Sequence, residues 1–344
     1  MLDRLRFARF AALGSLLLLS WVDRSSAQGV EAFYKGRQVN VLIGFGPGGA
    51  NDLWARVLAR HMGKHIPGNP TLVPQNAVGA GTLKLALQLA NASPPDGSVF
   101  GLISRGIPLE PLLGDKSVAF DSPKMSWIGS PDKDTTVCIA RSDAPVKNIA
   151  DLATMELTMG GTGSGADTAI YPEFFARFLG MKFKTVKGYP GSNEIFLALE
   201  RREVDGICIA YDSLIRQRMF LENEVRILFQ AALKPDPKIG SAPIVSDTVT
   251  DAYKRELLDF FLARAAIGRP FVAPPGVPAD RLAALQKAFM QTMVDPAFQA
   301  EAKQLGLSID PISGPELADL IARIYRTPAA SVKAVADILE TLAK

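Results

Sequence analysis

Apolar runs, glycine-rich breaks and amphipathic stretches follow one another in order over the first third of the chain. Residues 39–43 form an apolar run typical of a buried strand, and the glycines of residues 44–49 interrupt it. The next stretch has apolar residues at helical spacing on one face, namely Trp54, Leu58 and Met62. The same order then repeats. Strands are expected at 71–73 and 99–103, with a glycine break at 79–81 and a helix at 83–91 between them. Strands alternating with helices at this spacing predict parallel βαβ units in an α/β fold.

A second α/β unit is expected beyond residue 133. Strands are predicted at 136–140, 157–159, 184–187, 204–209 and 225–229, and helices at 148–153, 167–179, 192–201 and 212–221. A third glycine loop, residues 160–165, stands between a strand and the helix that begins at residue 167.

The C-terminal part has a different pattern. A trace of strand at residues 271–272 leads into the proline-rich run 273–278, and amphipathic helices fill residues 279–344, with breaks near Pro296, Pro311 and Pro328. Such helices need a sheet to pack on, and the first unit has few helices of its own. We therefore predict two lobes, a discontinuous first lobe at 28–133 plus 268–344 and a second lobe at 134–267. A signal peptide is predicted before them, at 1–27.

The N-terminus has the pattern of a secretory signal peptide. Arg4, Arg6 and Arg9 precede an apolar run over residues 10–22, and the small residues up to Ala27 fit a cleavage site after that position. The run is about 13 residues, whereas a membrane-spanning helix needs about 20. A cytosolic protein with an apolar first helix is the alternative. The pattern favours export to the periplasm.

Composition narrows the function classes. The 344 residues contain 38 Lys and Arg against 35 Asp and Glu, and removal of residues 1–27 would leave 34 against 33. This balance gives no signature of nucleic-acid binding. Two His and two Cys leave little material for a zinc site or a histidine-dependent triad, so we expect neither an enzyme nor a bound metal or cofactor.

Cys138 and Cys208 both lie in apolar, strand-like runs. An exported protein could pair them, but two cysteines alone are weak evidence for a disulfide. Two buried thiols are the favoured interpretation, and a disulfide is the alternative.

The first glycine loop formally matches the dinucleotide pattern G-x-G-x-x-G at residues 44–49. The next strand ends Val73-Pro74-Gln75-Asn76 without an acid to hold a ribose, and Pro47 removes an N–H from the loop. Dinucleotide binding is therefore not favoured.

A broader interpretation fits all three glycine loops, which each open a helix. Helix N-termini present unsatisfied N–H groups and the positive end of the helix dipole, so they bind anions without Lys or Arg. Each loop taken alone could be only a tight turn. Three loops at the carboxyl ends of strands, drawn from both lobes, predict a shared cleft for an anion.

Other candidate chemistry is sparse. His61 and His65 stand four residues apart on the first long helix, but no third ligand is evident, and a solvated helix end is favoured over a metal site. Asp52 is expected to act as a helix cap, with Asn51 as the alternative cap, rather than as a general base.

Several segments resemble the Bug, or TctC-type, solute-binding proteins of tripartite tricarboxylate transporters. Residues 45–52 resemble the family's F-x-x-G-G-x-x-D loop, its most specific feature. Further segments of this chain resemble other patterns of the family. These patterns are E-N-x-x-G-A-G (residues 75–81), P-D-G (95–97), S-x-G-x-G (161–165), Y-x-G (189–191), G-x-V-D (203–206) and A-P-x-G-x-P (273–278).

The resemblance implies a type II periplasmic-binding-protein fold, in which two α/β lobes close on a small organic carboxylate and present it to membrane subunits of a secondary transporter. It also implies a monomer. The residues that would bind the ligand, carried over by motif or by position in the loops, are Phe45, Gly46, Pro47, Gly48, Gly49, Asp52, Gly79, Ala80, Arg105, Thr162, Gly163, Ser164, Gly165, Tyr189 and Gly191.

Some positions depart from the family pattern. Gly161, Ala166 and Ala169 stand where Ser, Ser and His are usual, which puts citrate or a C4 dicarboxylate in doubt. Arg105 stands where a small polar residue is common and could pair with a distal carboxylate, or it could be a structural arginine. An exported hydrolase and a ligand-presenting sensory protein on the same fold are the alternatives to a transport receptor.

Overall fold

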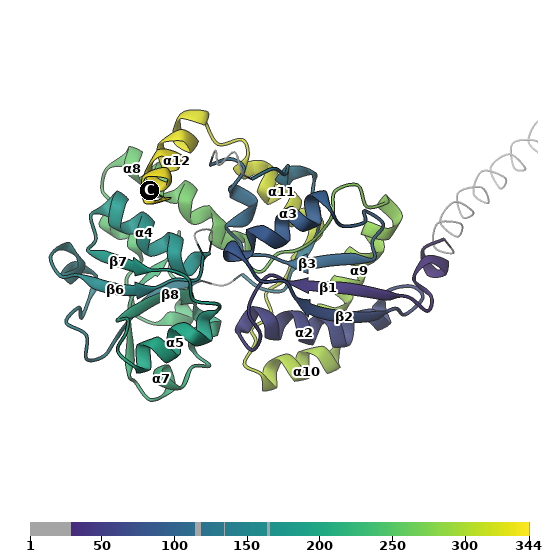
Figure 1. The fold of residues 1–344 in the computed structure, drawn as a ribbon, viewed down its shortest axis with the longest axis horizontal. Coiled ribbons are helices and arrows are strands. Elements are labelled where there is room, and N and C mark those ends of the chain that lie inside the picture. Colours follow the sequence, from purple (N-terminus) through teal and green to yellow (C-terminus); the bar gives the residue numbers. More distant parts are fainter. Residues whose placement is uncertain (1–28, 114–117, 134, 164–165, 344) are drawn as a thin grey trace, which may run out of the picture.

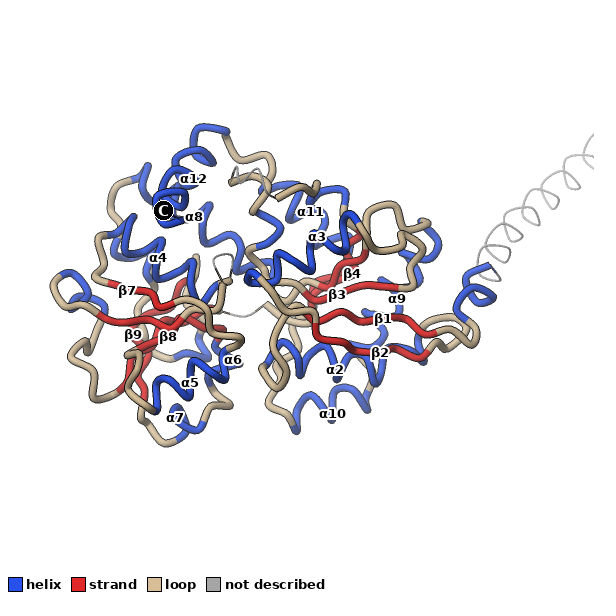
Figure 2. Tube along the Cα trace, in the orientation of Figure 1, coloured by secondary structure: helices blue, strands red, loops and turns tan. Residues whose placement is uncertain are grey.

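In the computed structural model, which describes residues 29–113, 118–133, 135–163 and 166–343, two α/β lobes lie side by side (Figure 1). Each lobe is built on its own β-sheet with helices packed around it (Figure 2). This arrangement confirms the predicted two-lobe α/β class.

The first sheet has six strands in the order β11-β4-β10-β3-β1-β2. β1 pairs in parallel with β2 and β3, whereas β10 runs antiparallel to both β3 and β4. The bounds of its strands are β1 Gln38–Ile43, β2 Thr71–Asn76, β3 Val99–Leu102, β4 Ser126–Ser130, β10 Phe271–Ala273 and β11 Ile312–Ser313.

The helices of the first half and of the tail cover this sheet. Their bounds are α2 Ala50–Met62, α3 Leu83–Asn91, α9 Ala279–Met293, α10 Pro296–Gln304 and α11 Gly314–Ile324. The predicted apolar face of α2 is buried, because Trp54, Leu58 and Met62 pack in one core cluster with Phe289 of α9 and Phe298 of α10.

The second sheet has five strands in the order β7-β6-β8-β5-β9. Their bounds are β5 Thr136–Arg141, β6 Leu157–Gly160, β7 Phe183–Val186, β8 Gly206–Ala210 and β9 Val225–Ala231. Its helices are α4 Asp167–Leu179, α5 Ser192–Glu200, α6 Tyr211–Leu214, α7 Arg218–Leu221 and α8 Ala252–Leu262. Phe174 of α4 stacks on Phe261 of α8 with ring centroids 3.7 Å apart, so aromatic packing joins these two helices.

Both sheets are mixed, which the prediction of parallel βαβ units did not include. β5 lies between β8 and β9 and is antiparallel to each. The strands that enter and leave the lobes, β4, β5 and β10, all have antiparallel neighbours. Residues 212–221 also form two short helices, α6 and α7, in place of one.

The last helix, α12 Ala329–Ala343, departs from the expected position of the tail. It packs on α4 and α8 of the second lobe and not on the first sheet (Figure 1). Val332 and Val335 are buried in the core cluster that contains Phe174 and Leu258, and this apolar face decides where the helix lies. The boundaries of the lobes at residues 133 and 268 stay a prediction.

Cys138 and Cys208 form a disulfide, so the favoured interpretation of two free thiols is wrong. The two residues stand directly opposite each other on the antiparallel strands β5 and β8, with Cα atoms 4.0 Å apart. The antiparallel register brings the side chains together on one face.

Candidate functional site

A cavity of about 360 Å³ lies between the two lobes. Eleven of the predicted ligand-binding residues line it, namely Phe45, Gly46, Pro47, Gly49, Gly79, Ala80, Arg105, Thr162, Gly163, Tyr189 and Gly191. Ser164 and Gly165 lie outside the residues that the structure describes. The topology thus brings loops from both halves of the sequence to one cavity.

The glycine loops of the two lobes approach each other at backbone distance. A Cβ on Gly46 would lie 3.4 Å from the carbonyl oxygen of Pro190, and both residues line the cavity. A Cβ on Gly163 would lie 3.0 Å from the carbonyl carbon of Ala80 and far inside van der Waals contact with the backbone nitrogen of Gly81. Glycine is therefore required at position 163 for this approach of the loops.

Three helices point their N-terminal turns at the cavity. Its lining includes Ala50 and Asn51 of α2, Asp167 and Thr168 of α4, and the first three residues of α5, which are Ser192, Asn193 and Glu194. The first N–H groups of a helix have no intrahelical partner, and the dipole is positive at that end. The sequence predicted that α2 and α4 begin at the cleft, but it did not predict this for α5.

Asp52 supports the first loop from behind and does not line the cavity. Its carboxylate accepts hydrogen bonds from the backbone N–H of Gly48 at 2.9 Å and from the side chains of Arg56 and Asn76 at 2.9 and 2.8 Å. Burial alone would raise the pKa of Asp52, but these hydrogen bonds outweigh it and lower the pKa. Asp52 is also not the helix cap that was predicted, because Gly49 is the N-cap of α2.

The backbone N–H of Thr162 already has a hydrogen-bond acceptor within the second lobe. It donates to the Oγ1 atom of Thr168 at 3.0 Å, which ties the glycine loop to the first turn of α4. Gly48 and Thr162 therefore use their N–H groups to shape the loops, although both residues were predicted as ligand contacts.

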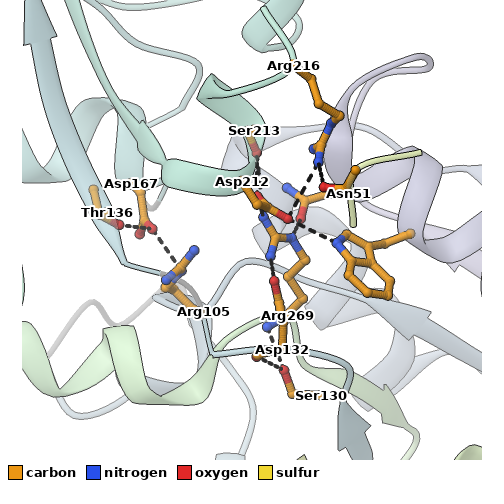
Figure 3. Close-up of polar contacts among 12 residues, drawn as sticks. Asn51, Arg105, Ser130, Asp132, Thr136, Asp167, Asp212, Ser213, Arg216 and Arg269 are labelled. Carbon is orange, nitrogen blue, oxygen red and sulfur yellow. Dashed lines mark hydrogen bonds and ion pairs between the residues drawn. The ribbon is translucent and has the colours of Figure 1, made fainter. Parts of the chain in front are cut away.

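Arg105 forms an ion pair with Asp167 across the cleft (Figure 3). The Nε atom of Arg105 lies 3.0 Å from Oδ2 of Asp167, and the two side chains are 6% and 14% exposed. Arg105 follows β3 in the first lobe and Asp167 opens α4 in the second. The cation that was expected to face a distal ligand carboxylate already faces a carboxylate of the protein.

Arg269 forms a second, more deeply buried cluster where the chain returns to the first lobe (Figure 3). It pairs with both Asp132 and Asp212, and its Nε donates to Oδ1 of Asn51 at 3.0 Å. Trp54 also donates to Asp212, at 3.3 Å. Burial raises the pKa of Asp132 to about 7, against the effect of the Arg269 charge.

The two histidines of α2 and the following turn pair with acids of the tail, so the prediction of a solvated helix end is wrong. The Nε2 atom of His61 lies 2.6 Å from Glu301, and that of His65 lies 2.8 Å from Asp295. Among the described residues, no group of three or more His, Cys, Asp or Glu is placed to hold a metal ion.

Sequence reasoning missed two cavity residues with acidic side chains, Asp167 and Glu194. Both stand in the first turn of a helix that follows a glycine-containing loop, and this shared position was the available signal. Arg269 was missed because its partners are distant in sequence, and only the return of the chain near residue 268 pointed to it.

The described part of the chain has no helix that combines the length and apolar character needed to cross a membrane. The chain matches the model of the tripartite tricarboxylate transporter family receptor, TctC, over residues 54–328. A UPF0065 protein of Bordetella pertussis is 27% identical over 297 residues, which cover 84% of this chain and 86% of the relative.

Two solved structures share the fold. The periplasmic binding protein BugD has a TM-score of 0.69 at 24% identity, over 90% of this chain and 99% of BugD. MatC of Rhodopseudomonas palustris, solved with bound malate, also has a TM-score of 0.69, at 20% identity over 88% of this chain and 99% of MatC.

The chain belongs to the TctC family of tripartite tricarboxylate transporter receptors. It is a solute-binding receptor and not an enzyme, as predicted. The family is one of periplasmic receptors, which supports a periplasmic location for this chain.

Proposed function

We propose that this receptor captures a small organic carboxylate in the cavity between the lobes. The observation that carries the proposal is the convergence of the N-terminal turns of α2, α4 and α5 on one cavity of about 360 Å³. A carboxylate can accept hydrogen bonds from such backbone N–H groups, and the helix dipoles favour its charge. The binding of malate by MatC, which shares the fold, agrees with this class of ligand.

The ligand contacts come from both lobes. Phe45, Gly46 and Gly49 would hold the carboxylate from the first lobe, with Pro47, Gly79 and Ala80 beside them. The loop of residues 162–165, including Ser164 and Gly165, would hold it from the second lobe, and Tyr189 and Gly191 would close the far side. Gly48 and Asp52 would keep the first loop in shape, because their hydrogen bond links the loop to α2.

Binding is proposed to close the two lobes by rotation at the crossing segments near residues 133 and 268. The side chain of Ser130 joins these segments, because it accepts a hydrogen bond from the N–H of Arg269 at 2.7 Å and donates to the carbonyl oxygen of Asp132 at 2.8 Å. Gly268 lies so close to Ser130 and Asp132 that a Cβ there would clash with them. These contacts would restrict the motion to a hinge.

The closed receptor would then deliver the carboxylate to the membrane subunits of the transporter. We propose that the protein acts as a monomer and that residues 1–27, which lie outside the described residues, direct its export with cleavage near Ala27.

Native mass spectrometry of the protein purified from the exporting cells tests the ligand class. We expect a mass adduct that leaves on mild activation and has the mass and fragmentation of a small organic acid. A matched sample of the Gly163→Ala variant is the control and should carry no adduct, since its loops cannot approach each other. A bound compound without a carboxylate would contradict the proposal.

A further inference from the structure

The charged side chains that line the cavity balance one another. Among the described lining residues the cations are Arg105 and Arg269, and the anions are Asp167 and Glu194. No Lys or His belongs to that lining. The cavity therefore has no surplus of positive side chains for a ligand with two negative charges.

Both arginines are already engaged by carboxylates. Arg269 pairs with Asp132 and Asp212 in the cluster at the crossing segments. Arg105 pairs with Asp167 at 3.0 Å, and both side chains are largely buried. The positive ends of the helices can hold one carboxylate, but a second one would need a charged partner inside a poorly solvated site.

We propose that Asp167 is a specificity-determining residue that makes the cleft select monocarboxylates over dicarboxylates. This inference rests on the proposed carboxylate function. Asp167 neutralises Arg105, the cation best placed to receive a distal carboxylate, and repels any second carboxylate that comes near the pair. Its effect is strengthened by burial, because charges interact more strongly where water is excluded.

The position of Asp167 is fixed by its surroundings. It is the first residue of α4, a helix of 13 residues, and the hydroxyl of Thr136 donates to its Oδ2 atom at 3.4 Å. Figure 3 shows Asp167 between Thr136 and Arg105. A carboxylate that opens a helix and is held through its Oδ2 atom by both Arg105 and Thr136 is suited to discriminate between ligands, because its position is set by the protein.

Calorimetric titration with length-matched acids tests the role of Asp167. The probes are butanoate against succinate, hexanoate against adipate, and benzoate against terephthalate. The wild-type protein should bind the monocarboxylate of at least one pair at least tenfold more tightly than its dicarboxylate partner. Asp167→Asn, which keeps the shape of the side chain, should shift this ratio by about tenfold or more toward the dicarboxylate, and Asp167→Ser should shift it in the same direction.

Two further variants test whether the change in ligand preference comes from the Arg105–Asp167 ion pair or only from the loss of a negative charge. Asp143→Asn makes the same charge change in the second lobe outside the cavity, where Asp143 pairs with Arg141 and Arg202, and it should leave the ratio unchanged. Arg105→Met combined with Asp167→Asn should lose the gain for dicarboxylates, because the gain needs the released guanidinium.

Tighter binding of dicarboxylates by the wild-type protein, with the same ratio in Asp167→Asn, would overturn the inference and leave the carboxylate function standing. A loss of affinity for both members of a pair in Asp167→Asn and Asp167→Ser, with no change in their ratio, would reduce Asp167 to a structural role and also overturn it. Failure of the wild-type protein to bind any of these acids would count against the proposed function and this inference together.

Discussion

Two buried arginines stand at the boundary between the lobes, and their surroundings differ. Arg269, at the crossing segments, is 2% exposed and is shared by Asp132 and Asp212, with Asn51 as a further partner. Arg105, at the cavity, is 6% exposed and pairs with Asp167 on the opposite wall. Both arginines line the cavity, but the two carboxylates that hold Arg269 lie outside that lining, whereas Asp167, which holds Arg105, belongs to it. The same ion-pair chemistry can therefore serve the hinge in one place and ligand selection in the other.

Arg269→Met should have the largest effect on stability. It would leave two buried carboxylates without their main cation, and removal of one partner of a buried pair costs about 3–5 kcal/mol. Urea unfolding monitored by circular dichroism would measure the loss. Arg255→Met is the control, since Arg255 pairs with Asp259 at the surface and should contribute less than about 1 kcal/mol. Equal losses in the two variants would remove the distinction between the hinge cluster and an ordinary surface pair.

Asp132 should make the hinge cluster sensitive to pH. Burial raises its pKa to about 7, above the value of about 3.9 expected in the unfolded chain. The folded protein thus holds a proton that the unfolded chain releases, so the stabilisation from this group is complete below about pH 4 and is lost as the pH rises through 7.

The free energy of unfolding, measured from pH 5 to pH 8, should fall by about 1–3 kcal/mol more in the wild-type protein than in Asp132→Asn. Asp310→Asn changes an exposed acid and should keep the wild-type slope. Parallel curves for the wild-type protein and Asp132→Asn would show that Asp132 is ionised throughout this range.

Arg105→Met should have the smallest effect on stability, about 1 kcal/mol. Asp167 would lose its cation but would keep the hydroxyl of Thr136 and the positive end of α4. The same urea unfolding experiment gives the value. A loss as large as that of Arg269→Met would mean that the cleft pair is mainly a structural bridge.

The elements that depend on local sequence were predictable. The helices that begin at residues 83 and 167 have the predicted bounds, because a glycine loop and an apolar periodicity define each one. The three glycine loops reach one cavity because the carboxyl ends of neighbouring strands meet at one edge of each sheet.

Features that depend on distant pairing were not predictable from these patterns. Arg105 and Asp167 come from different lobes, and Arg269 is 137 residues from Asp132, so no local spacing connects them. The disulfide depends on the antiparallel register of β5 and β8, which the apolar runs around Cys138 and Cys208 do not fix. The place of α12 depends on which apolar surface is left uncovered by the rest of the fold.

Loops from both lobes are proposed to close on one carboxylate, and calorimetric titration of Gly163→Ala measures whether binding needs this approach of the loops. The titrant is the monocarboxylate from the matched series that binds the wild-type protein most tightly. Gly29→Ala is the control, because a Cβ on Gly29 meets nothing within 4 Å. Gly163→Ala should weaken binding at least about 100-fold, or about 2.8 kcal/mol, while its melting temperature and the affinity of Gly29→Ala stay near the wild-type values. Unchanged affinity in Gly163→Ala would show that ligand binding does not need the loops of the two lobes to approach each other.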